Sequence, residues 1–329
     1  MKWLLIIFKS QNKSNFKYKK VFNMKITGTF LDEISHDIPS ANWGAEEWAK
    51  DFDCMRMIGI DTVIIIRAGY KNMAIFDSAT LKKHRGMIIS PNYDLAEIFL
   101  READRCGMKL FFGTYDSGEN WHAEQFQKEI EINYKFTEEL FSKYGHFKSL
   151  GGWYICHEID SCNENVMRVY KQLARHLKAM KNIPILISPY IHGRKQFGND
   201  AISIANHKAQ WDKAFSKFEG GVDIVAFQDG QVDYEELNDF LHVNNELAKK
   251  YGLTCWSNVE TFDRDMPINF LPIGWPKLLH KINAASQAGV DKLITFEFSH
   301  FLSPNSMYPS ARGLFKRYVE WIENKGDKC

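Results

Sequence analysis

Two apolar segments of the chain end in a glutamate that does not fit a purely structural strand. The stretch GGWYICHEID (151–160) turns polar at His157 and Glu158, and CWSNVETF (255–262) leads to Glu260. A carboxylate is costly to bury unless it is paired or functional. Glycoside hydrolysis uses two carboxyl groups, one to protonate the departing oxygen and one to attack the anomeric carbon. We therefore take Glu158 and Glu260 as candidate catalytic residues, provided that the fold brings them together.

Eight apolar segments rich in β-branched and aromatic residues alternate with amphipathic stretches. The predicted strands are 25–33, 61–69, 108–116, 148–158, 183–190, 222–230, 253–262 and 291–300. Their apolar residues do not alternate with polar ones, which is typical of parallel strands that helices cover. The predicted helices are 44–58, 93–106, 119–144, 164–180, 232–250, 275–288 and 308–324. This repeat predicts an α/β protein with a single (β/α)₈ TIM barrel.

An open, doubly wound sheet is the alternative fold. Such sheets usually carry a glycine-rich phosphate loop after the first strand, and GTFLDE (28–33) is not one. We expect the barrel to occupy residues 24–329. Residues 1–23 form a basic N-terminal segment, interpreted as a tail, a signal-like remnant or an extension upstream of a start at Met24. Its apolar part, WLLIIF (3–8), is too short to span a bilayer.

The overall composition limits the classes of partner. The 329 residues carry a formal net charge of +1, which provides no basic surface for nucleic acid or for an anionic membrane. The six cysteines are scattered without a CxxC pair, which indicates free thiols rather than a zinc site or a disulfide scaffold. We expect a cytoplasmic protein, or a periplasmic or secreted one if residues 1–23 act as an export signal.

The active sites of TIM barrels lie at the carboxyl ends of the strands. Nearly every predicted strand ends in residues that can hydrogen-bond to a substrate, and aromatic residues at or after strand ends could stack on sugar rings. The candidate substrate-binding residues are Asp32, Arg67, Tyr115, His157, Tyr190, Gln228, Asp229, Trp256, Asn258, Glu297, His300, Trp43 and Trp121. The simpler interpretation is that the aromatic residues belong to the core and that Asp229, which precedes a glycine, caps a turn. Glu297 also competes as a catalytic carboxylate.

Other catalytic chemistries find less support in the sequence. There is no HxH, HExxH or paired-cysteine pattern for a metal and no GxSxG motif for a serine nucleophile. We therefore expect neither a metal nor a cofactor. A metal set made of Asp116, His157 and Glu158 stays open as an alternative.

The positions of the two glutamates resemble those of the clan A glycoside hydrolases. Those enzymes are retaining barrels with the acid/base at the end of strand four and the nucleophile at the end of strand seven, which implies these roles for Glu158 and Glu260. The resemblance also implies that Arg67, at the end of strand two, steadies the nucleophile. In that clan an asparagine before the acid/base binds the sugar 2-hydroxyl, whereas this chain has His157 there.

A second resemblance covers more of the chain. The stretches GTFLDE, GIDTVIIIRAG, GGWYICHEID and WSNVETF resemble a bacterial barrel family of unknown function, DUF4434, which is grouped with glycoside-hydrolase-like barrels. The expected function is therefore that of a retaining glycoside hydrolase acting on a carbohydrate. The alternatives are a barrel that binds carbohydrate without cleaving it, and a metal-dependent barrel hydrolase or isomerase.

Overall fold

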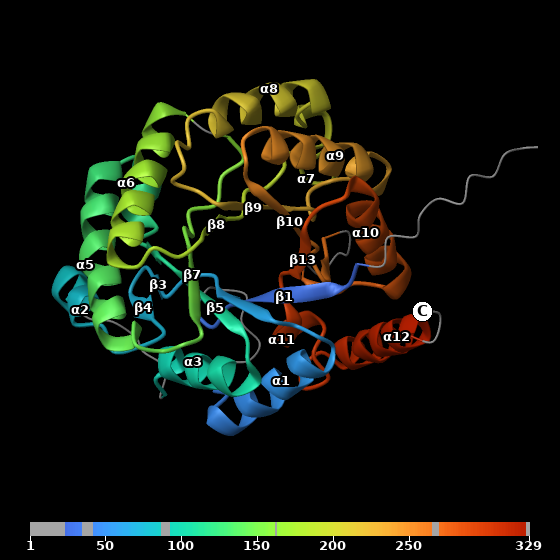
Figure 1. Cartoon of the computed structure of the whole chain (residues 1–329), viewed down its shortest axis with the longest axis horizontal. Coiled ribbons are helices and arrows are strands. Elements are labelled where there is room, and N and C mark those ends of the chain that lie inside the picture. Colours follow the sequence, from blue (N-terminus) through green and yellow to red (C-terminus); the bar gives the residue numbers. More distant parts are fainter. Residues whose placement is uncertain (1–23, 35–41, 87–92, 162, 265–269, 327–329) are drawn as a thin grey trace, which may run out of the picture.

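Eight parallel strands close into a single barrel, which confirms the predicted fold (Figure 1). The computed structural model describes residues 24–34, 42–86, 93–161, 163–264 and 270–326; the predicted N-terminal segment 1–23 lies outside them. Around the barrel the strands are β1 (Ile26–Leu31), β13 (Lys292–Thr295), β10 (Thr254–Asn258), β9 (Ile224–Gln228), β8 (Ile185–Ile187), β7 (Leu150–Tyr154), β5 (Lys109–Gly113) and β2 (Thr62–Ile65). Each lies within a predicted strand but is shorter. Most of the polar residues predicted for the site therefore lie in loops beyond the strand ends.

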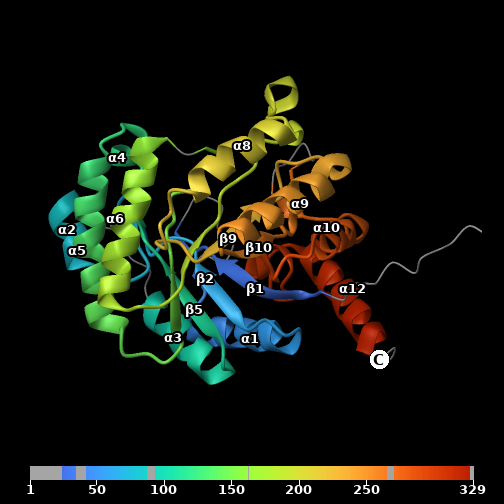
Figure 2. The same cartoon turned by 45° about the horizontal axis from the view of Figure 1, so that its top comes forward.

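Helices surround the strands on the outside of the barrel (Figures 1 and 2). The main ones are α1 (Ala45–Met57), α3 (Leu95–Cys106), α5 (Phe126–Tyr144), α6 (Glu164–Met180), α8 (Ile204–Phe215), α9 (Tyr234–Lys250), α10 (Trp275–Ala288) and α12 (Pro309–Gly326). All except α8 match predicted helices. The predicted helix 119–144 is divided into α4 (Glu119–His122) and α5. Gly107 and Gly289 end α3 and α10 in the left-handed conformation that glycine adopts cheaply.

Short elements extend the loops at the barrel mouth. They are β3 (Gly69–Tyr70), β4 (Met73–Ala74), α2 (Ala79–Arg85), β6 (Tyr115–Asp116), α7 (Arg194–Phe197), β11 (Phe262–Asp263), β12 (Leu271–Pro272) and α11 (Phe298–Phe301). The strand order β4-β3-β6 joins the loops after β2 and β5, and β11 pairs with β12 after β10. These pairings give the loops around the mouth a fixed backbone.

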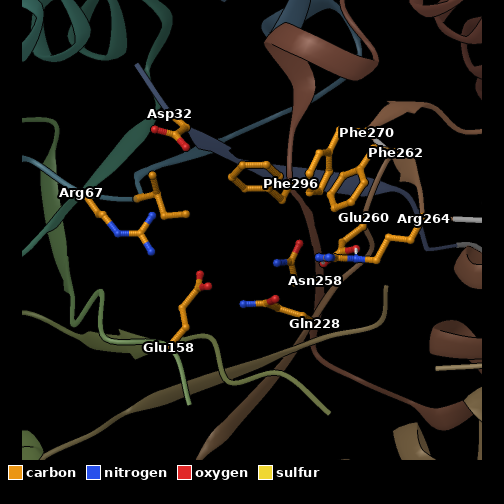
Figure 3. A pocket seen from close by; sticks show the side chains of 11 residues that line it. Asp32, Arg67, Glu158, Gln228, Asn258, Glu260, Phe262, Arg264, Phe270 and Phe296 are labelled. Carbon is orange, nitrogen blue, oxygen red and sulfur yellow. Dashed lines mark hydrogen bonds and ion pairs between the residues drawn. The ribbon is translucent and has the colours of Figure 1, made fainter. Parts of the chain in front are cut away.

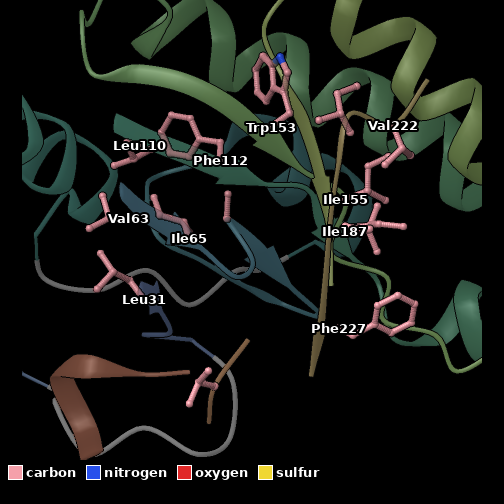
Figure 4. Close-up of a cluster of buried hydrophobic side chains, with 14 of the residues drawn as sticks. Leu31, Val63, Ile65, Leu110, Phe112, Trp153, Ile155, Ile187, Val222 and Phe227 are labelled. Carbon is pink, nitrogen blue, oxygen red and sulfur yellow. The ribbon is translucent and has the colours of Figure 1, made fainter. Parts of the chain in front are cut away.

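Two separate apolar clusters lie on the two faces of the barrel wall. The outer cluster fills the space between strands and helices and contains Trp153 and Ile155 (Figure 4). The inner cluster fills the barrel and contains Tyr154, Cys156 and Trp256. Because successive side chains of a strand point to opposite faces, these two clusters determine which residues after each strand face the mouth.

The structure also bears on the expectations about membrane helices and cysteines. Among the described residues, no helix is long and apolar enough to cross a membrane. The four cysteines within the described ranges, Cys54, Cys106, Cys156 and Cys255, are free, as predicted for them.

Gly113 offers a test of how tightly the strands are packed. A Cβ atom added there would lie 2.3 Å from the backbone oxygen of Ile65, which cannot move without disturbing β2. We expect Gly113→Ala to lower the free energy of unfolding by about 1–3 kcal/mol, as overpacking usually does, measured by urea denaturation. Gly313→Ala in α12 is the matched control, because its Cβ would meet nothing within 4 Å. Equal stability of both variants would contradict this description.

Candidate functional site

A cavity of about 190 Å³ lies at the carboxyl ends of the strands (Figure 3). Its charged and polar lining comes from five different strands and their loops, and its apolar lining is mostly phenylalanine. The lining residues are Asp32, Ile66, Arg67, Glu158, Gln228, Asn258, Glu260, Phe262, Arg264, Phe270 and Phe296. The two predicted catalytic glutamates thus enter one cavity, together with four predicted binding residues: Asp32, Arg67, Gln228 and Asn258.

The alternation of side chains explains why both glutamates face inward. Tyr154 and Cys156 belong to the inner cluster, so Glu158 continues the inward series after β7. In the same way Trp256 lies in the inner cluster below Asn258 and Glu260. This places the two carboxyl groups above the filled part of the barrel.

Glu158 is partly buried and has one close hydroxyl partner. The Tyr154 hydroxyl donates to Glu158 Oε1 at 3.2 Å. Burial raises the pKa of Glu158 above its ordinary value, although the positive charge of Arg67 and hydrogen bonds from Gln228 and Tyr154 oppose this. The nearby charge of Glu260 raises the pKa further. Glu158 is therefore placed to hold a proton at a higher pH than an ordinary glutamate.

Glu260 is buried and held by a guanidinium group. Arg264 Nε lies 3.2 Å from Glu260 Oε2, and Arg264 Nη2 lies 3.1 Å from Oε1. The guanidinium carbon also lies 4.8 Å from the centre of the Phe262 ring and 5.6 Å from that of Phe270. This bidentate pair gives Glu260 an environment different from that of Glu158.

The carboxylate of Glu260 also requires a glycine beside it. A Cβ atom added at Gly230 would lie 1.5 Å from Glu260 Oε2 and 2.8 Å from Arg264 Nε. No other residue type fits at position 230 while Glu260 and Arg264 keep their places.

A buried ion pair fixes the backbone of Glu260 from behind. Lys281 Nζ, on α10, lies 2.7 Å from Asp229 Oδ1 and donates to the Glu260 carbonyl oxygen at 3.1 Å. Asp229 Oδ1 also accepts from the Glu260 backbone N–H at 3.0 Å. Burial raises the pKa of Asp229, and Lys281 opposes this shift. Asp229 thus lies behind the cavity wall rather than in the cavity lining, because it follows Gln228 and points to the outer face of the barrel.

Arg67 lies on the opposite side of the cavity from Glu260. Its Nε lies 3.4 Å from Asp116 Oδ2, and its guanidinium stacks on Tyr70 at 5.2 Å. Figure 3 shows the guanidinium directed toward Glu158. The cation that forms an ion pair with Glu260 is Arg264.

His157 lies outside the cavity lining, which differs from the expectation that it contacts a sugar. Its neighbours Trp153 and Ile155 belong to the outer cluster, so His157 also points outward. His157 Nε2 lies 2.9 Å from Glu129 Oε1 on α5, and the imidazole ring lies 4.6 Å from that of Trp121. The Trp121 ring therefore packs against His157 and is not part of the cavity lining.

The other predicted aromatic residues also lie outside the lining of the cavity. Tyr115 lies in the outer cluster, where its hydroxyl donates to the Lys71 carbonyl oxygen at 2.8 Å. Trp43 packs against Trp48 at 5.1 Å. Trp256 fills the barrel beneath the cavity.

Tyr190 is partly buried beside the site. Its backbone N–H donates to the Ile159 carbonyl oxygen at 3.0 Å. Burial and the charge of Asp160 raise the pKa of the Tyr190 hydroxyl to about 12. Tyr190 is not part of the cavity lining.

Glu297 and His300 form a buried ion pair behind the cavity wall. Glu297 Oε2 accepts from the Asp32 backbone N–H at 3.0 Å, so the pair supports a lining residue without being one. Burial raises the pKa of Glu297 to about 7, and His300 opposes this shift. Burial alone would lower the pKa of His300, but the Glu297 carboxylate outweighs it and the pKa is about 10.

Three buried residues beside the cavity have the residue types and spacing of a metal site. One ligand atom from each of Asp116, Glu129 and His157 lies within 4.8 Å of the others. The structure thus joins His157 and Asp116 to Glu129, not to Glu158 as the metal alternative supposed. Glu129 already accepts hydrogen bonds from the backbone N–H and hydroxyl of Ser117, which favours a structural network.

Several residues of the site were not predicted. Phe262 and Phe296 lie in predicted strands and were not among the predicted site residues, although they follow the inward series. Arg264 follows Glu260 by four positions, which was the available signal. Lys281 lies within a helix, and no sequence pattern connects it with the mouth.

The buried Asp229–Lys281 pair predicts a large loss of stability when one partner is removed. Lys281→Met would leave Asp229 buried without its cation, so we expect the free energy of unfolding to fall by about 3–5 kcal/mol, measured by urea denaturation. Lys250→Met is the matched control, because the Lys250–Asp212 pair is exposed and such pairs contribute little. A Lys281→Met variant as stable as Lys250→Met would refute the anchoring role.

Three comparisons place the chain among known proteins. The model of a family described as a domain of unknown function, DUF4434, matches residues 26–308. A proposed alpha-L-fucosidase from Bacteroides thetaiotaomicron VPI-5482 is similar in structure, with a TM-score of 0.88 and 46% identity over 97% of this chain and 99% of that chain. No curated protein matches.

More distant solved structures share the fold alone. An endo-1,4-beta-D-mannanase from Thermotoga petrophila RKU-1 has 13% identity and a TM-score of 0.54 over 83% of this chain and 88% of that chain. An exo-beta-1,4-mannosidase from Opitutaceae bacterium strain TAV5 also has 13% identity and a TM-score of 0.54, over 92% of this chain and 60% of that chain. Because the family model and the 46% identical structure both span most of the chain, this protein belongs to the DUF4434 family of TIM barrels.

Proposed function

We propose that this protein is a retaining glycoside hydrolase, with Glu158 as acid/base and Glu260 as nucleophile. The observation that carries the proposal is that two glutamates enter one cavity from different strands and have different environments. Burial favours the protonated form of Glu158, whereas Glu260 is paired with a guanidinium group. An acid that burial keeps protonated, facing a carboxylate held by a cation, is the arrangement that acid and nucleophile roles need.

The two residues would act in two steps. Glu260 attacks the anomeric carbon while the glycosidic C–O bond breaks and the departing oxygen takes the proton of Glu158. Glu158, now a carboxylate, then takes a proton from water as that water displaces Glu260 from the sugar. Asp32, Gln228 and Asn258 supply hydrogen-bonding groups for sugar hydroxyls.

The comparisons support a carbohydrate substrate and suggest substrates to test. The related Bacteroides structure is named as a proposed alpha-L-fucosidase, and two proteins of the same fold are named as enzymes acting on mannans or mannosides. Fucosides and mannosides therefore belong in the first substrate panel. The three phenylalanines of the lining offer apolar surface for the C–H face of a sugar ring.

The first test is hydrolysis of aryl glycosides and oligosaccharides by Glu158→Gln and Glu260→Gln. We expect each variant to lose at least about 100-fold in kcat/KM, because each lacks a group that acts in the transition state. Azide should restore turnover to Glu260→Gly, since it replaces the missing nucleophile. Exposed Glu164→Gln is the control and should keep full activity.

The same assay separates the alternatives. Turnover that a chelator abolishes would replace the proposal with a metal-dependent enzyme. Sugars that bind without turnover would indicate a carbohydrate-binding barrel. Turnover that survives both glutamate substitutions would refute the catalytic pair.

The raised pKa of Glu158 predicts the alkaline side of the pH profile. The acid must be protonated to act, so kcat/KM should fall as the pH rises through the raised pKa of Glu158, above the range of an ordinary glutamate. With a dinitrophenyl glycoside, which needs no protonation on departure, Glu158→Gln should lose this alkaline limb. An unchanged limb in that variant would assign it to another group.

A further inference from the structure

The two arginines of the cavity lie beside different glutamates. Arg264 holds Glu260 by two contacts of 3.1 and 3.2 Å, and Arg67 lies with Asp116 on the side of Glu158. We propose that Arg264 is the positioning residue for Glu260, and that Arg67 serves Glu158 instead. This inference rests on the proposed function for its effect on catalysis, and it departs from the role that the clan A resemblance implies for Arg67.

The surroundings of Arg264 restrict its movement. Its side chain is 25% exposed, and its guanidinium carbon lies within 6 Å of the centres of two phenylalanine rings. The missing side chain at Gly230 leaves the space in which Glu260 Oε2 and Arg264 Nε meet. A planar guanidinium held in this way fixes the plane of the carboxylate, which a point charge such as lysine does not.

The bidentate geometry is compatible with nucleophilic attack. A carboxylate has about four lone-pair sites, and the two contacts with Arg264 use two of them. One oxygen therefore keeps a lone pair for the anomeric carbon while the other remains bound. Because the Glu260 backbone is separately held by Asp229 and Lys281, Arg264 acts on the orientation of the side chain rather than on the position of the strand.

Arg67 is held in place by different partners. It contacts Asp116 and stacks on Tyr70, and its charge acts on Glu158, where it opposes the rise in pKa caused by burial. The titratable and charged groups around Glu158 are Arg67, Tyr154, Tyr190, Glu260 and Arg264. Glu158 is the largest of the charges that act on Arg67, whereas Arg264 forms the ion pair with Glu260 and acts on Glu158 only through its charge.

The experiment compares Arg264→Ala with Arg67→Ala, each in the full chain. In crystal structures, we expect the Glu260 carboxylate to rotate in Arg264→Ala and to keep its place in Arg67→Ala. In hydrolysis, Arg264→Ala should lose about 100-fold in kcat with little change in KM, as misplacement of a reacting group does. Added guanidinium ion, at a concentration that leaves the protein folded, should restore part of that loss in Arg264→Ala and none in Arg67→Ala.

The pH profile provides the reciprocal measurement. Removing Arg67 takes away a charge that lowers the pKa of Glu158, so the alkaline limb should move to higher pH in Arg67→Ala and less in Arg264→Ala. A Glu260 carboxylate that stays in place without Arg264, or guanidinium rescue of Arg67→Ala alone, would overturn the inference. The crystal structures decide the positioning role even if no glycoside is hydrolysed, so its failure and that of the proposed function can be told apart.

Discussion

The site depends on the alternation of side chains along each barrel strand. Tyr154 and Cys156 are packed inside the barrel, and this obliges Glu158 to face the mouth while His157 faces the helices. A shift of one residue would exchange the two and would also move Trp153 out of the outer cluster. The packing of two apolar clusters therefore selects which polar groups can meet a substrate, and the chemistry follows from that selection.

The polar residues that face outward form a second layer that supports the first. Asp229 and Lys281 hold the backbone of Glu260, Glu297 and His300 hold that of Asp32, and Glu129 orients His157 beside them. Burying these charges is costly unless every partner is present. The first two pairs tie a cavity residue to a helix or loop behind the wall, and the His157–Glu129 pair ties the loop after β7 to α5. These buried polar contacts thus support the mouth together with the strand pairings in its loops.

The sequence was sufficient to predict the strands, the barrel and the placement of Glu158 and Glu260 in one cavity. These features depend on apolar runs and on the rule that active residues follow strand ends, both of which are local. Counting alternate residues from the strand centre would also have separated His157 and Asp229 from the lining. Lys281 could not be found in this way, because its partners are distant in sequence and depend on how α10 packs against the strands. The substrate-binding role of the lining residues remains a prediction.

Lys281 connects α10, in the outer layer of helices, directly to the backbone of Glu260 at the mouth. Because the backbone of Glu260 is held by a helix on the outside, loops other than those that carry Gly230 and Arg264 can change in length and composition without releasing that backbone. A change in the packing of α10, by contrast, would be transmitted to Glu260 over the thickness of the wall. Engineering of a new specificity would therefore begin with the loops and leave this helix as it is.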